Sequence, residues 1–177
     1  LKDLQGNKMK SASWYRNAVS LIADRSSPSE LFASGKLLGR PSAGRMSMFF
    51  YDPKFKQRLP YYDEFPLVLP LEPMKGGFIG LNFHYLPYGA RFKFLQQLQS
   101  YASNGKFDQS TKIQASYSSI KNNKYTKVSI KRYLYSHVRS NFLRVDVNEM
   151  ALAAYLPVAQ FQGRSLGGVF AAARRNF

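Results

Sequence analysis

The sequence lacks cysteine, has few acidic residues and contains no long apolar run. The absence of cysteine excludes disulfides, thiolate catalysis and cysteine-based zinc sites. No apolar run reaches the roughly 18 residues that a membrane-spanning helix needs, so such a helix is excluded, and no membrane is among the predicted partners. The first residues also lack the apolar segment of a secretory signal. Because the sequence begins with Leu1 rather than methionine, we expect that a processed or omitted segment precedes it.

The scarcity of acids makes the protein strongly basic. Its 177 residues include 26 Lys and Arg against 10 Asp and Glu, a formal net charge of +16. Such a surface attracts polyanions, so nucleic acid is the first candidate partner and an acidic protein or membrane surface is the second. A hydrophobic content of 45% with 15% aromatic residues indicates a folded chain with an aromatic-rich core.

The positive charge is concentrated in residues 101–145, which carry nine bases and one acid. Bases and aromatic residues are interleaved there, which is typical of a surface that neutralises phosphates and stacks on nucleobases. The alternative is a solvated charged face with the tyrosines in the core. The predicted DNA-binding residues are Lys121, Lys124, Lys127, Lys131, Arg132, Tyr133, Tyr135, Arg139 and Arg144.

The chain divides into three predicted parts. Residues 1–38 are expected to form a helical arm, in which Ser27 and Glu30 are spaced as a capping box. Residues 39–45 are rich in Gly, Pro and Ser and are expected to be a linker. Residues 46–177 are predicted to be a single α+β domain.

Within that domain, about residues 46–86 predict a small, highly curved antiparallel sheet or barrel. Extended apolar runs alternate there with turn signals at Asp52-Pro53 and Lys75-Gly76-Gly77. Four prolines argue against a long central strand, because each removes a hydrogen-bond donor from the ladder. The fold class is therefore α+β, with the sheet flanked by the N-terminal helical arm and by C-terminal helices.

Residues 128–140 are ambiguous. As a strand, they place Ile130 and Leu134 on one face and Lys131 and Tyr133 on the other; as a helix, they align Ile130 and Leu134 with Val138. We favour a helix, followed by a strand at 142–147. The remaining elements predicted in this half of the chain are helices at 91–102, 148–155 and 165–175 and a strand at 158–162.

No catalytic constellation is recognisable. The acids Asp52, Asp63, Glu64 and Glu72 lack the spacing of a metal-binding cluster, so they are expected to finish turns and to pair with Lys54, Lys56 and Arg58. His84 is expected to be a hydrogen-bonded structural residue, and neither it nor His137 has a nucleophile at a recognisable spacing. We therefore predict no catalytic residue, no metal, no cofactor and no enzymatic activity.

The run "MFFYDPKFKQRLPYYDEFPLVLPLEPMKGGFIGLNFHYLP", residues 48–87, resembles a virion protein family of contractile-tailed phages of the T-even type and their marine relatives. The resemblance continues in residues 130–142 and 155–162. Members of this family are described as DNA end protectors or head completion proteins.

The resemblance implies a virion protein, present in the host cytoplasm during assembly, that binds double-stranded DNA ends without reading sequence. It implies shielding of those ends from exonuclease during packaging and injection, with portal, neck or tail proteins as further partners. The alternative is a structural component of the neck, tail or baseplate that makes protein contacts without binding DNA ends. A metal-dependent nuclease ranks below both.

Overall fold

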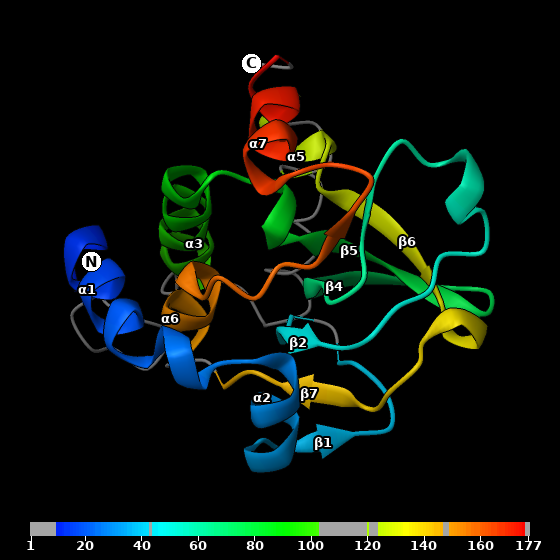
Figure 1. Ribbon diagram of the computed structural model, residues 1–177, viewed down its shortest axis with the longest axis horizontal. Coiled ribbons are helices and arrows are strands. Elements are labelled where there is room, and N and C mark those ends of the chain that lie inside the picture. The colour runs from blue at the N-terminus through cyan, green and yellow to red at the C-terminus, as the bar shows by residue number, and fades with distance from the viewer. Residues whose placement is uncertain (1–9, 43, 103–119, 121–123, 147–148, 176–177) are drawn as a thin grey trace.

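An antiparallel sheet forms the centre of the protein, and helices lie beside it (Figure 1). The computed structural model describes residues 10–42, 44–102, 120, 124–146 and 149–175. The main sheet has six strands in the order β1-β7-β2-β4-β5-β6, and β3 pairs with β8 in a second sheet. The strands are β1 Leu37–Leu38, β2 Ser47–Met48, β3 Tyr62–Asp63, β4 Leu67–Met74, β5 Gly77–Asn82, β6 Ile130–Leu134, β7 Phe142–Arg144 and β8 Phe161–Gln162.

The predicted α+β class is confirmed, and of the two predicted alternatives the structure has a sheet and not a closed barrel. The edge strands β1 and β6 lie at opposite ends of the strand order. All strand pairs in the described part of the chain are antiparallel.

Strand β4 is longer than its prolines predicted, since Pro70 and Pro73 both lie within its eight residues. β2 pairs with Leu67 and Val68. The part of β4 that contains the prolines pairs with β5, across a bulge between Pro70 and Glu72. The missing N–H groups of the two prolines are tolerated because this stretch of β4 has a neighbouring strand on one side only, as at a sheet edge.

The helices follow from local signals in the sequence. In α1 the Ser11 hydroxyl accepts a hydrogen bond from Trp14 N at 3.2 Å. The predicted capping box of α2 is confirmed: Ser27 Oγ accepts from Glu30 N, and the Glu30 carboxylate accepts from Ser27 N. The helices are α1 Ala12–Ile22, α2 Pro28–Ser34, α3 Tyr88–Ala102, α5 Lys124–Lys127, α6 Met150–Tyr155 and α7 Leu166–Arg174. In the part of the chain that the structure describes, no helix is long and apolar enough to cross a bilayer.

The prediction of a helix at 128–140 is wrong. Residues 130–134 form β6, which pairs with β5 from Leu81↔Ile130 to Gly77↔Leu134, and a 3-10 turn follows at Tyr135–His137. The strand is favoured because its alternating side chains pack on both faces of the sheet: Ile130 packs against one cluster of buried residues and Tyr133 belongs to another. The predicted strand at 142–147 is confirmed in the shorter form of β7, and the predicted helices near the C-terminus correspond to α6 and α7.

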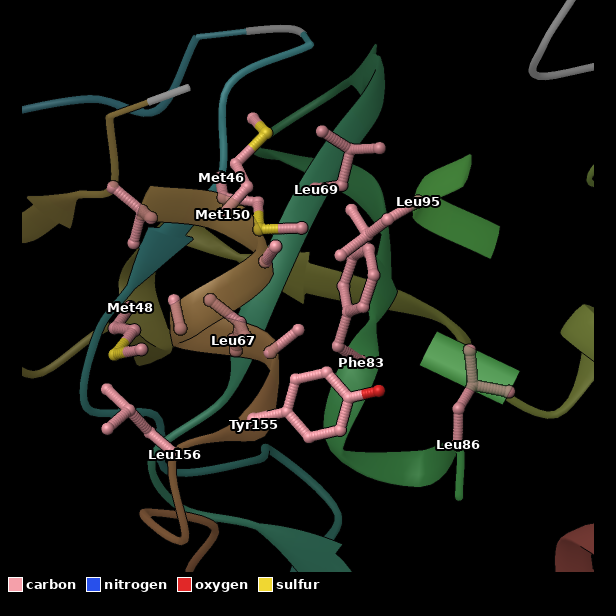
Figure 2. Close-up of a cluster of buried hydrophobic side chains, with 14 of the residues drawn as sticks. Met46, Met48, Leu67, Leu69, Phe83, Leu86, Leu95, Met150, Tyr155 and Leu156 are labelled. Carbon is pink, nitrogen blue, oxygen red and sulfur yellow. The ribbon is translucent and has the colours of Figure 1, made fainter. Parts of the chain in front are cut away.

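A larger hydrophobic core fills the space between one face of the sheet and helices α1, α3 and α6. Figure 2 shows the part of this core that the strands share with α3 and α6. Met48 and Leu67 reach it from the strands, and Leu95 and Tyr155 reach it from α3 and α6. From the predicted arm, Tyr15 of α1 stacks on Tyr155 with ring centroids 6.2 Å apart. Residues of the arm therefore contribute to the same core, while the three-part division of the chain stays a prediction.

A smaller aromatic cluster covers the opposite face of the sheet. Phe49 lies at its centre, with ring centroids 4.8 Å from Phe142 and 5.2 Å from Tyr133. Because β4 is buried on both faces, its sequence is a continuous apolar run rather than an alternating one. The members of the cluster are Phe49, Tyr51, Val68, Phe78, Tyr133 and Phe142.

Candidate functional site

A pocket of about 440 Å³ opens between strand β6 and the loop of residues 49–61 that joins β2 to β3. In Figure 1 this loop rises beside β6 on the side of the sheet away from α1. Tyr51 fixes the base of the loop, because its hydroxyl accepts a hydrogen bond from Leu134 N at 3.2 Å. Asp52 N donates to His137 O at 3.0 Å, which continues this attachment along the chain.

Strand β6 directs Lys131 towards the pocket. The pairing Lys131↔Gly80 places the lysine on the same face of the sheet as Tyr133. The ammonium nitrogen lies 4.1 Å from the centre of the Tyr85 ring, a cation–π contact. Burial lowers the pKa of Lys131 to about 8, so the side chain is mostly protonated at pH 7. Among the ion pairs of the described residues, none involves Lys131.

The loop adds an exposed aromatic ring and more positive charge. Phe55 is 56% exposed, and Lys54 and Arg58 lie over its ring at 5.3 and 5.9 Å. The loop is held at its start by Asp52, whose carboxylate pairs with Lys56 at 2.8 Å and with Arg139 at 3.3 Å. The hydrogen bond from Lys56 lowers the pKa of Asp52. The pairing predicted between Lys56 and a nearby acid is therefore confirmed.

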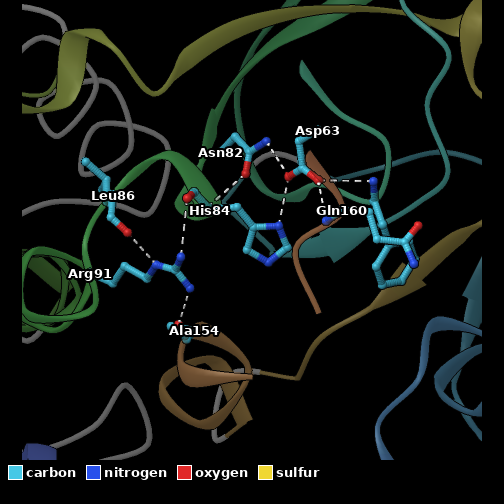
Figure 3. A network of polar contacts seen from close by, with 8 residues as sticks. Asp63, Asn82, His84, Leu86, Arg91, Ala154 and Gln160 are labelled. Atoms are coloured by element: carbon cyan, nitrogen blue, oxygen red, sulfur yellow. Dashed lines mark hydrogen bonds and ion pairs between the residues drawn. The ribbon is translucent and has the colours of Figure 1, made fainter. Parts of the chain in front are cut away.

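A buried polar network lies below the pocket, centred on Asp63 (Figure 3). Asp63 Oδ2 accepts hydrogen bonds from Asn82 Nδ2 at 3.0 Å and from His84 Nδ1 at 2.8 Å. Asp63 Oδ1 accepts from the backbone N–H groups of Phe65 at 3.1 Å and Gln160 at 3.2 Å. The expectation that this acid finishes a turn is confirmed by the hydrogen bond from Phe65 N, two residues on, but the sequence did not show that the carboxylate is buried and accepts from three further donors.

The network holds Asp63 ionised and His84 neutral. Burial alone opposes ionisation of Asp63, but His84 and the hydrogen bonds to the carboxylate outweigh it and hold its pKa below the usual range. Burial lowers the pKa of His84 more than Asp63 raises it. His84 Nε2 is buried without a hydrogen-bond partner among the described residues, so a second ring proton has no acceptor there.

The Asp63–His84 pair differs from the Asp–His pair of a hydrolase in the contact of its second ring nitrogen. In hydrolases with an Asp–His pair, the second ring nitrogen hydrogen-bonds a nucleophile. His84 is fully buried and its Nε2 has no such partner in the described part of the chain. The expectation that His84 is hydrogen-bonded is confirmed, and its purely structural role stays a prediction.

Arg91 continues the network and was not singled out from the sequence. Its guanidinium donates to Leu86 O and Ala154 O, both at 2.7 Å, and to His84 O at 3.3 Å. The cation also lies 4.4 Å from the Tyr88 ring, and burial lowers its pKa to about 10. Arg91 thus joins the start of α3 to the end of α6, which a pattern of apolar spacing in α3 does not reveal.

The state of His84 predicts acid sensitivity. Above the unfolded-state pKa of 6.5 its contribution to stability is fully present, because both states are unprotonated. Below it the unfolded chain takes up a proton more readily than the folded chain, so the free energy of unfolding should fall with pH by up to about 1.4 kcal/mol per pH unit. Urea unfolding at a series of pH values between about 6.5 and 5.5 measures this slope. A slope unchanged in His84→Gln would contradict the assignment.

The structure brings together part of the predicted DNA-binding set. Lys131, Arg132 and Tyr133 lie on β6, and Tyr135 follows in the 3-10 turn. Arg40, which was not predicted, lies over the Tyr135 ring at 5.1 Å.

The rest of the predicted set lies elsewhere or is not described. Lys127 is exposed at the end of α5, and Arg139 is exposed and pairs with Asp52. Lys121 lies outside the described residues, and Lys124 is described only as the first residue of α5.

Two members of the predicted set do not fit an exposed surface beside β6. Tyr133 is 3% exposed and sits in the aromatic cluster, so its ring is not available for stacking on a base. Arg144 lies on β7, which is separated from β6 by three strands, and pairs with Asp146.

Lys54 and Phe55 were missed because the sequence analysis assigned the bases of the loop of residues 49–61 to pairing with acids. The alternation of aromatic and basic residues in "DPKFKQR" was the available signal.

No group of three or more metal-ligating side chains occurs among the described residues.

The sequence model of one family, described as phage T4 terminal DNA protecting protein, matches residues 4–175. No curated protein and no solved structure matches the chain.

Proposed function

The chain belongs to the family of the phage T4 terminal DNA protecting protein, and we propose that it binds the ends of double-stranded DNA and shields them from exonuclease. The observation that carries this proposal is the family match, which covers nearly the whole chain. The family is described by protection of DNA and not by a reaction, and we propose that the protein protects by binding without cleaving. Binding requires no base readout, because an end is common to every sequence.

The charge distribution supports this proposal. A formal net charge of +16 draws the protein to the phosphate backbone irrespective of sequence. We propose that the contact surface is centred on the pocket, where Lys54, Lys131 and Arg132 converge. From the sequence-based set, we propose Lys127, Tyr135 and Arg139 as further contacts, while Lys121 and Lys124 stay predicted contacts from the sequence alone.

An end differs from an interior site by one base-pair face that no neighbour covers. We propose that Phe55 and Leu59, which are 56% and 43% exposed, cover that face. Stacking on an aromatic ring is worth about 1–3 kcal/mol per base and tolerates every sequence. An exonuclease must bind the terminal nucleotide, and the protein bound at the end then blocks its access.

The finer biological setting is also part of this proposal. We propose that the protein completes the head as a virion component, acts during packaging and injection, and is present in the host cytoplasm during assembly. Portal, neck or tail proteins are the proposed protein partners.

A competition assay tests end binding. A linear duplex bound by the protein is treated with exonuclease in the presence of unlabelled DNA, either linear fragments or closed circles of equal total mass. We expect linear fragments to abolish protection at a concentration at least about tenfold lower, because the stacking contact is made only at an end. Equal competition by the two forms would contradict the proposal.

One observation favours the second candidate, a structural component of the neck, tail or baseplate. Trp14, Leu21 and Ile22 on α1 are 48%, 83% and 36% exposed, and large apolar groups of this kind favour a protein contact. A symmetric copy number of the chain in the virion shell or tail, with no preference for DNA ends, would favour this role.

A further inference from the structure

The pocket beside β6 holds a cation that has no acid partner among the described residues. Lys131 is half-buried, and its ammonium group rests on the Tyr85 ring 4.1 Å away. The cations that pair with acids nearby, Lys56 and Arg139, both pair with Asp52 outside the pocket wall. A buried ammonium without an anion is costly, so this position favours an anionic ligand.

The pocket has the size and the charge for a small anionic group. Its volume of about 440 Å³ lies in the range of ligand pockets, about 300–1,000 Å³. Lys54 and Arg132 also line it, so three cations surround the space. The acid at its floor, Asp63, is 4% exposed, and both its oxygens are occupied by donors. The balance of accessible charge in the pocket is therefore positive.

We propose that this pocket receives the terminal phosphate of a DNA strand, with Lys131 as its main counter-charge. The inference rests on the proposed end binding and deepens it. A phosphomonoester carries a charge of about −1.5 to −2 at pH 7, whereas each phosphodiester inside the duplex carries one negative charge. A phosphomonoester occurs only where a strand stops, so this pocket distinguishes an end from the interior by chemistry as well as by shape.

The surroundings of Lys131 strengthen the contact. Tyr51, Tyr85 and Tyr133 line the pocket and reduce its access to water, and charge-assisted hydrogen bonds are stronger in such a site than on an open surface. Lys54, on the exposed loop, and Arg132, on the edge strand, lie where they would meet the next phosphates of the same strand.

Hairpin duplexes with one open end test the proposal. Fluorescence anisotropy would compare ends that carry a 5′-phosphate, a 3′-phosphate or hydroxyl groups alone, and a closed dumbbell of the same sequence. We expect one of the two phosphates to tighten binding about tenfold over the hydroxyl end, the size of one charge-assisted hydrogen bond. The two phosphorylated forms decide which strand terminus the pocket takes.

Three variants assign the effect to Lys131. Lys131→Gln is expected to lose the preference for phosphate, and Lys131→Arg to keep most of it, because the charge is retained. Lys93→Gln, which removes an exposed lysine of α3, is the matched control and should behave as the wild type.

The outcomes separate this inference from the proposed function. If hydroxyl ends bind more tightly than the dumbbell but neither phosphate adds affinity, the phosphate pocket is wrong and end binding stands. An undiminished phosphate preference in Lys131→Gln also overturns the pocket assignment. If every open end binds no better than the dumbbell, the proposed function fails and the inference fails with it. The comparison of ends on the wild type needs no variant, so a misfolded variant leaves the test intact.

Discussion

Replacing Asp63 by asparagine should lower the free energy of unfolding by about 3 kcal/mol, although the two side chains have nearly the same shape. The reason lies in the partners of the carboxylate, which are all donors: Asn82 Nδ2, His84 Nδ1–H and two backbone N–H groups. In asparagine an NH₂ group, which donates and does not accept, replaces one of the two carboxylate oxygens. The two buried donors that bonded this oxygen then face another donor, and each loses its acceptor.

Rearrangement of the neighbours does not remove this mismatch. Asn82 cannot flip its amide freely, because its Oδ1 already accepts from His84 N at 2.9 Å. His84 could move its proton to Nε2, but that nitrogen is buried and has no acceptor among the described residues. The backbone N–H groups of Phe65 and Gln160 can only donate, so they cannot adapt to an NH₂ group.

Urea unfolding of Asp63→Asn and the wild type at neutral pH measures this loss. Asp52→Asn is the matched control, since Asp52 is also paired but its side chain is 37% exposed. Exposed pairs contribute about 0–1 kcal/mol, so the control should change little. Equal effects of the two substitutions would show that the Asp63 network does not stabilise the fold.

The second large effect is expected in the salt dependence of DNA binding. Replacing Lys54, Lys131 and Arg132 by glutamine removes three proposed phosphate contacts. Each contact contributes about 0.9 to the slope of log affinity against log salt, so the slope should flatten by about 2.7. The same relation predicts a loss of about 500-fold in affinity at roughly 0.1 M salt and little loss near 1 M.

A second triple variant separates a local surface from general charge. Lys36→Gln, Lys93→Gln and Arg174→Gln remove three exposed cations from other parts of the fold, and both triple variants lower the formal net charge from +16 to +13. We expect the slope of this control to stay close to that of the wild type. If both triple variants flatten the slope equally, binding follows net charge and the surface around the pocket has no special role.

Local features were predicted well because their physics is local. The capping box joins Ser27 to Glu30, three residues apart, and the apolar run of β4 reflects burial on both faces of one strand. The interleaving of bases and aromatic residues singled out Lys131 and Arg132, which line one pocket with Lys54, and their role in DNA binding stays a prediction. The same pattern could not show that Tyr133 turns into the aromatic cluster, because alternation does not say which face of a strand is covered.

The pocket depends on contacts between distant parts of the chain. Lys54 and Lys131 are far apart in sequence and meet because the loop of residues 49–61 is tied to the end of β6. Arg144 was grouped with them by sequence proximity, yet the strand order places β7 on the far side of three strands. Sheet order decides which bases share a surface, and it is not encoded in spacing.

The sequence by itself determined the charge, the absence of cysteine chemistry, the helix caps and the family to which the chain belongs, since these depend on composition and local order. Only the tertiary structure decided that residues 130–134 form a strand, because β5 supplies the backbone partners that an isolated segment lacks. It also decided that Asp63 is a buried structural ion and that Lys131 has no acid partner among the described residues. Both follow from burial and from neighbours that only folding brings together.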